Sequence, residues 1–141
     1  MHKILKIALL FFTITFTSFA QQENAIIGRY LLPNQIEIEV FKEDNLFSAK
    51  IVALNNYKNG QTKDVKNATK SKRKDLLLGK VVLTNLVFDS ISKQWKKGKM
   101  YAPDKGITVN LKVTKINKKE VIVVGSKYLF WKTITWKKIE N

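Results

Sequence analysis

Cysteine is absent from this 141-residue chain, and histidine occurs once, at position 2. The missing thiol excludes disulfides, thiolate metal sites, cysteine nucleophiles and a lipid-modified N-terminal cysteine. Proline occurs twice and acidic residues 11 times, against 26 lysines and arginines, so the formal net charge is +15. With 45% hydrophobic residues the chain is too apolar for wholesale disorder, and its length suits a single domain.

The one long hydrophobic run lies at the N-terminus. Two lysines precede the apolar residues 7–16, and the small residues Ser18 and Ala20 follow this run. The run is shorter than the roughly 20 residues that span a bilayer. This pattern is typical of a secretory signal peptide. We therefore expect residues 1–20 to be removed after Ala20, residues 21–141 to form one domain, and the protein to be periplasmic or secreted.

Cleavage after position 20 would change the net charge of the chain and the kinds of catalytic and metal site that it can form. The mature chain keeps 24 basic and 11 acidic residues, a net charge of +13, and it has neither histidine nor cysteine. It therefore lacks the parts of Ser-His-Asp and Cys-His machinery and the usual ligands of zinc, copper and haem. We expect a protein that is not an enzyme and has no cofactor or metal. Export also argues against a nucleic-acid partner.

Apolar and polar residues alternate through the rest of the chain. Residues 35–42 (QIEIEVFK) place isoleucine and valine on one face and glutamate on the other, and residues 107–116 repeat the pattern. The other expected strands are residues 26–32, 46–54, 80–88, 93–101, 120–126 and 130–139. Tight polar links separate them. The sequence thus predicts an all-β fold, an eight-stranded antiparallel up-and-down barrel, with a two-sheet sandwich as the alternative.

One link differs from the others in length and charge. Residues 55–75 are nearly free of apolar side chains and carry seven lysines or arginines against two aspartates. Links of this length without their own structure are usually functional lids or disordered segments. We keep two interpretations, a solvated loop and a lid that contacts an anionic partner.

Several motifs along the chain resemble a known family. Gly28-Arg29-Tyr30 stands where that family opens with Gly-x-Trp, and residues 64–67 match its Asp-x-x-Asn element. Residues 95–103 (WKKGKMYAP) are similar to its most specific block, Trp-x-x-Gly-x-Ile-Tyr-x-Pro, and residues 133–136 give its closing Thr-x-x-Trp. The order of these motifs resembles the exported bacterial family called domain of unknown function 2147, over residues 27–139.

The resemblance implies a fold and leaves the biochemical role open. It implies a calycin-like, that is lipocalin-like, β-barrel, in agreement with the strands expected from alternation. Ala102 departs from the family, in which an acid is common at this position. Any polar role of that acid would therefore be missing here.

Aromatic residues in the second half of the chain are the candidate binding residues. Trp95, Tyr101, Phe130 and Trp136 would either fill the barrel interior or line a site for an apolar ligand. Tyr30 and Trp136 belong to the first and last expected strands. We expect their rings to pack together where the barrel closes.

These observations lead to two hypotheses about function. The first is a non-catalytic binding module for a small apolar or amphipathic ligand, contacted by the four aromatic residues, with residues 55–75 as the lid. The alternative is a basic surface that binds anionic glycans or lipids of the cell envelope. Its cations would be Lys72, Arg73, Lys74, Lys96, Lys97 and Lys99. We expect a monomer that does not span the membrane. The sequence does not fix whether the barrel interior is open or filled.

Overall fold

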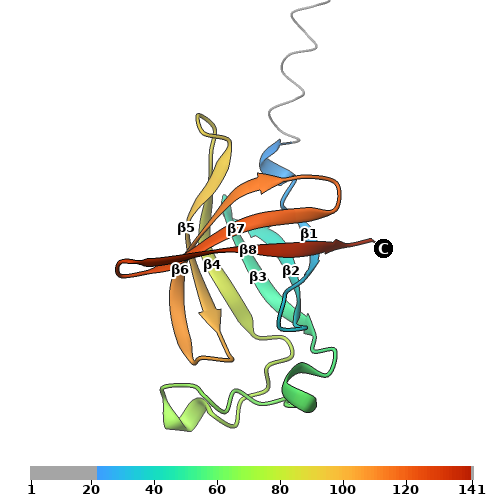
Figure 1. Ribbon diagram of the computed structural model, residues 1–141, viewed down its shortest axis with the longest axis vertical. Helices are drawn as coiled ribbons and strands as arrows, with labels where there is room; N and C mark the ends of the chain where they lie inside the picture. Colours follow the sequence, from blue (N-terminus) through green and yellow to red (C-terminus); the bar gives the residue numbers. More distant parts are fainter. Residues whose placement is uncertain (1–21, 141) are drawn as a thin grey trace, which may run out of the picture.

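Eight antiparallel strands follow one another around a closed barrel in the computed structural model, which describes residues 22–140 (Figure 1). The strands are β1 (Gly28–Leu31), β2 (Glu37–Glu43), β3 (Leu46–Ala53), β4 (Val81–Asp89), β5 (Gln94–Ala102), β6 (Ile107–Ile116), β7 (Glu120–Lys127) and β8 (Phe130–Ile139). Each expected strand is present, and its ends lie within two residues of the expected ones. The expected signal peptide and its cleavage site lie outside the described residues.

Pairing between the first and last strands decides between a barrel and a sandwich. β1 pairs with β8 in antiparallel register, Tyr30 opposite Lys138, and this pairing closes the sheet. The rings of Tyr30 and Trp136 meet inside the seam with their centroids 6.0 Å apart and tilted by 49°. Both the barrel and this predicted contact are confirmed. This pairing covers residues 29–31 and 137–139, so the two end strands of the sheet protect each other there.

Buried aromatic side chains pack together at the end of the barrel where the first described residues lie. This is the upper end in Figure 1. Trp95 packs against Phe88 with ring centroids 5.0 Å apart, and its indole Nε1 donates to the backbone oxygen of Glu23 at 3.1 Å. The Tyr30 hydroxyl donates to the backbone oxygen of Ile26 at 2.7 Å. The first described residues therefore lie across this end and satisfy polar groups of the aromatic side chains.

The long link between β3 and β4 lies at the opposite end, drawn in green at the bottom of Figure 1. It contains two short 3₁₀ turns, η1 (Tyr57–Asn59) and η2 (Lys70–Lys72). Tyr57 is buried although it belongs to this link. In the described part of the chain, no helix has the length and apolar character needed to cross a bilayer.

Candidate functional site

A cavity of about 680 Å³ occupies the end of the barrel that side chains do not fill. Its inner wall is apolar because successive strand residues alternate between the two faces of the sheet. The wall includes Ile38, Ile51, Val82, Met100 and Leu111, and the indole of Trp136 belongs to it. The volume lies within the range of about 300–1,000 Å³ that small-molecule sites occupy.

Polar and charged side chains lie at the rim of this cavity. The rim is built by the turn after β1, the turn after β5 and the hairpin that joins β7 to β8. Asp104 and Lys105 come from the second of these turns, and Lys127 and Lys132 come from the hairpin. The apolar wall and the mainly cationic rim together suit an amphipathic ligand with an anionic group.

Three of the four predicted aromatic residues line the cavity, each from a different place. Trp136 is 2% exposed and belongs to the inner wall, whereas Phe130 is 80% exposed at the rim. Tyr101 contributes from the end of β5. Trp95 lies in the filled end instead, because it stands six positions before Tyr101 in β5, roughly 20 Å along the strand. The spacing of the two residues on the expected strand 93–101 is consistent with this separation, but the sequence did not show which end of the barrel is filled.

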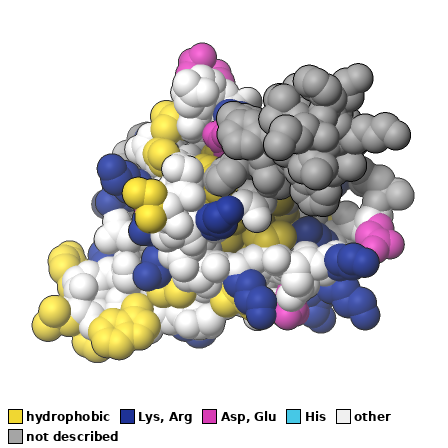
Figure 2. All heavy atoms as spheres, turned by 90° about the horizontal axis from the view of Figure 1, so that it is seen from above, with side chains coloured by type: hydrophobic (Ala, Val, Ile, Leu, Met, Phe, Trp, Pro, Cys, Tyr) yellow, Lys and Arg dark blue, Asp and Glu magenta, His cyan; other side chains and the backbone are white. Residues whose placement is uncertain are grey.

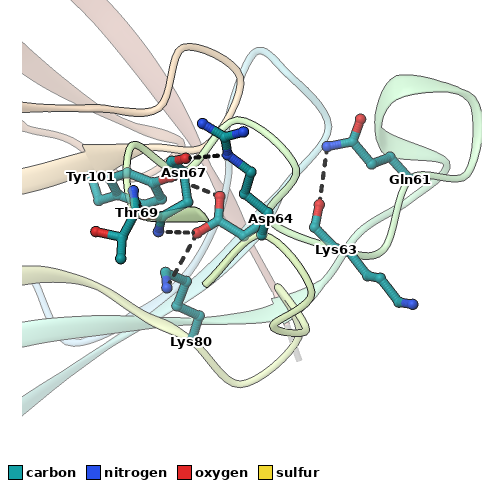
Figure 3. Close-up of polar contacts among 8 residues, drawn as sticks. Gln61, Lys63, Asp64, Asn67, Thr69, Lys80 and Tyr101 are labelled. Atoms are coloured by element: carbon teal, nitrogen blue, oxygen red, sulfur yellow. Dashed lines mark hydrogen bonds and ion pairs between the residues drawn. The ribbon is translucent and has the colours of Figure 1, made fainter. Parts of the chain in front are cut away.

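A buried carboxylate contacts Tyr101, one of the residues that line the cavity (Figure 3). Asp64 is fully buried, and its Oδ1 accepts a hydrogen bond of 2.7 Å from the Tyr101 hydroxyl. Its Oδ2 accepts one of 2.8 Å from Asn67 Nδ2 and lies 3.3 Å from Lys80 Nζ. The Lys80 ammonium also lies 5.4 Å from the centroid of the Tyr101 ring. Each carboxylate oxygen is thus paired, as burial of a charge requires.

The Asp64 cluster orders the long link. Asn67 Oδ1 accepts from the Thr69 amide at 2.9 Å, and the Asn67 carbonyl accepts from Arg73 Nε at 2.8 Å. Among the residues that the structure describes, none from 55 to 75 lines the cavity. The link therefore braces the wall at Tyr101. Most of its residues are exposed, as expected of a solvated loop, although Tyr57, Asp64 and Asn67 are buried. Its role as a lid stays a prediction.

Two tyrosines near this carboxylate are held in their neutral form. Burial raises the pKa of Tyr101, and the hydrogen bond to Asp64 raises this pKa further. Burial, followed by the charges of Asp104 and Asp64, raises the pKa of Tyr57 to about 12. The Tyr57 hydroxyl is buried, and among the described residues it has no hydrogen-bond partner. The hydroxyl of Tyr101 is thus engaged, and that of Tyr57 is not.

Sequence reasoning did not identify this cluster as a unit. The Asp-x-x-Asn element was visible as a family motif, but nothing in the spacing predicted that Lys80 and Tyr101 would join it. The oxygens of Asp64 accept hydrogen bonds from an amide and a phenol, and one of them also forms an ion pair with an ammonium. In the described part of the chain, no group of three or more acids, histidines or cysteines could hold a metal.

The six cations proposed for surface binding lie on the long link and on β5. Lys72, Arg73 and Lys74 are exposed on the link. On β5, Lys96 pairs with Asp89 at 3.0 Å, Lys99 donates to Asn110, and Lys97 is exposed. Arg73 is also engaged, with the Asn67 carbonyl. Binding of an anionic polymer by these residues stays a prediction.

Comparison with known proteins agrees with the barrel. A family model described as an uncharacterized protein conserved in bacteria (DUF2147) matches residues 28–138. Protein HP1028 from Helicobacter pylori, described as belonging to the lipocalin family, superimposes with a TM-score of 0.72 at 22% identity. The match covers 82% of this chain and 84% of that one. No curated protein matches the sequence.

Proposed function

The chain belongs to the bacterial family of uncharacterised proteins DUF2147, and from the cavity in its barrel we propose that it binds a small apolar or amphipathic ligand without transforming it. The observation that carries this proposal is the cavity of about 680 Å³ with an apolar wall and a cationic rim. The lipocalin-like fold supports it, since such barrels can hold one small ligand.

The wall and the rim suggest how a ligand would lie. Its apolar part would enter toward Ile38 and Trp136, where burial of apolar surface is worth about 25 cal/mol per Å². Its polar or anionic end would stay at the rim near Lys105 and Lys132. The wall is closed on the side of Tyr101, because the Asp64 cluster holds that side chain in place.

Binding is favoured over catalysis by the chemistry of the chain. Beyond position 2 it has no histidine and no cysteine, the commonest general base and the strongest nucleophile. Export of the mature protein is part of the same proposal. Sequencing the N-terminus of the protein recovered from fractionated cells tests it, and an intact Met1 would contradict it.

Gly125 offers a direct test of the cavity. It lines the cavity from β7, and a Cβ placed there would meet nothing closer than Val109 Cγ2 at 3.7 Å. Gly125→Leu should therefore fill the cavity without disturbing the barrel. We expect it to weaken binding of anilinonaphthalene sulfonate, an amphipathic anionic fluorophore, by about tenfold or more.

The matched control is Val124→Leu. Val124 is the preceding residue of β7, points to the other face of the sheet and does not line the cavity. This variant should bind the fluorophore as the parent protein does. Fluorescence titration and native mass spectrometry measure both variants. Equal binding by Gly125→Leu and the parent would place the ligand outside the barrel and overturn the proposal.

A further inference from the structure

The hairpin between β7 and β8 exposes four consecutive large apolar residues. Tyr128, Leu129, Phe130 and Trp131 are 90%, 87%, 80% and 76% exposed. The hairpin projects to the left in Figure 1, and Figure 2 shows hydrophobic side chains gathered at this end of the molecule. Soluble proteins rarely keep such contiguous patches without an interaction that covers them.

The backbone makes this hairpin a preformed protrusion. β7 and β8 pair continuously from Glu120 opposite Lys137 to Lys127 opposite Phe130, and only Tyr128 and Leu129 connect them. Tyr128 adopts a φ of 56°, as a two-residue hairpin turn requires. The apolar tip is therefore presented on a rigid ribbon, and binding would not have to order it.

Cations surround the apolar tip. Lys127 and Lys132 flank it directly. A surface hollow of about 250 Å³ beside the hairpin is lined by Lys99, Lys127 and Tyr128, together with hydroxyl and amide side chains. The Lys127 ammonium lies 5.6 Å from the centroid of the Tyr128 ring and donates to the Thr108 carbonyl at 3.0 Å. Aromatic tips flanked by lysine match the headgroup region of a bilayer, where aromatic rings and cations both lie favourably.

The apolar tip could be covered by a second copy of the chain or by a lipid surface, and the charge of the protein favours one of these two. A second copy of the mature chain would bring the same lysines and a net charge of +13 against the first, and like charges oppose association. An anionic lipid surface complements these charges instead. We propose that the β7–β8 hairpin docks this protein on an anionic membrane surface, with residues 128–131 inserted at headgroup level.

Docking through this hairpin would also orient the cavity. Phe130 and Trp131 belong to the exposed tip and to the lining of the cavity, so its mouth would face the bilayer. An amphipathic ligand could then pass between bilayer and barrel without crossing water. This consequence rests on the proposed function, whereas docking itself does not.

Flotation with lipid vesicles tests the proposal. We expect the full mature chain to float with vesicles of mixed phosphatidylcholine and phosphatidylglycerol, and to bind pure phosphatidylcholine vesicles at least about tenfold more weakly. The double variant Tyr128→Ser, Leu129→Ser should bind the mixed vesicles about tenfold or more weakly than the parent. The control is Ile91→Ser, because Ile91 is 93% exposed in the turn between β4 and β5. This variant should bind as the parent does.

A second pair of variants tests the charges. Lys132→Glu should weaken binding to the mixed vesicles about tenfold, since each lysine near such a surface contributes about 1 kcal/mol. Lys118→Glu makes the same charge change in the exposed turn between β6 and β7, away from the hairpin. It should have a smaller effect. Equal losses for the two variants would show attraction by net charge alone and would overturn the assignment of the hairpin.

The remaining outcomes are equally decisive. Binding by Tyr128→Ser, Leu129→Ser as tight as that of the parent would overturn the proposal. Concentration-dependent dimers that this variant abolishes, without vesicle binding by the parent, would assign the patch to a second copy. Neither residue lines the cavity, so this variant should keep its affinity for anilinonaphthalene sulfonate. Failure of docking is therefore distinguishable from failure of the proposed ligand-binding function.

Discussion

Asp64 shows how one residue joins the long link to the barrel wall. Its carboxylate is fully buried, and the Tyr101 hydroxyl, the Asn67 amide and the Lys80 ammonium satisfy it. A buried ion pair is costly to break, because removal of one partner leaves the other charge uncompensated. The aspartate and the asparagine were recognisable in the sequence as a motif. Their partners were not, because 37 residues separate Asp64 from Tyr101.

Removal of the hydroxyl should have different effects on protein stability at Tyr101 and at Tyr57. Tyr101→Phe removes a donor from buried Asp64, and we expect the free energy of unfolding to fall by about 1–3 kcal/mol. Tyr57→Phe removes a buried hydroxyl that has no partner among the described residues. That change should be neutral or slightly stabilising. Urea unfolding followed by circular dichroism compares them, and equal destabilisation would contradict this account of the cluster.

At the scale of the element, the turn after β5 meets the long link backbone to backbone. A Cβ at Gly106 would lie 2.0 Å from the Lys66 carbonyl oxygen, and Gly106 has a φ of +68°. Gly79 has a φ of +85°, but a Cβ there would meet nothing within 4 Å. At Gly106 a side chain is therefore excluded both by the left-handed backbone conformation and by contact with the link. At Gly79 only the backbone conformation disfavours a side chain.

This difference makes a matched pair of substitutions. Gly79→Ala should lower the free energy of unfolding by about 1–2 kcal/mol, the cost of a left-handed conformation with a Cβ. Gly106→Ala should lower it further, because the link must also move away from the turn. Chemical denaturation measures both. A loss for Gly106→Ala no larger than that for Gly79→Ala would show that the link is not firmly packed there.

The strands were predictable because each is amphipathic with a period of two. In β8, Ile134 and Trp136 point inward, as alternation from Phe130 predicts. Phe130 has the same parity yet is 80% exposed, because the hairpin extends past the end of the barrel. Alternation assigns a face of the sheet, but it does not say how far a strand extends beyond its neighbours.

At the scale of the whole molecule, the fold holds buried tyrosine hydroxyls neutral, both in the barrel and in the long link. Burial raises the pKa of Tyr30 to about 12, and burial is also the largest cause of the raised pKa of Tyr57. The pKa of a tyrosine in the unfolded chain is about 10, lower than in the folded protein. The folded state therefore holds these protons more tightly, and its stability is highest below pH 10, where both states are protonated. This stabilisation is lost as pH rises from about 10 through about 12.

We therefore expect the free energy of unfolding to fall steeply above about pH 10, where the unfolded tyrosines ionise first. A tenfold difference in proton affinity between the folded and unfolded states is worth about 1.4 kcal/mol per group. Denaturant titrations across this range measure the fall, and tyrosinate absorbance reports the ionisation. Tyr57→Phe should reduce the slope. A stability that stays constant up to about pH 12 would contradict the burial of these groups.

The sequence by itself determined the strands, their order, the family resemblance and the exclusion of cysteine chemistry, because these follow from residue types and from local periodicity. Only the tertiary structure decided that β1 closes on β8, that one end is filled around Trp95 and that the other holds a cavity beside Trp136. The physical reason is that an interior volume depends on which side chains meet across the barrel. Those side chains come from strands far apart in the chain, and no local pattern records how they fit together.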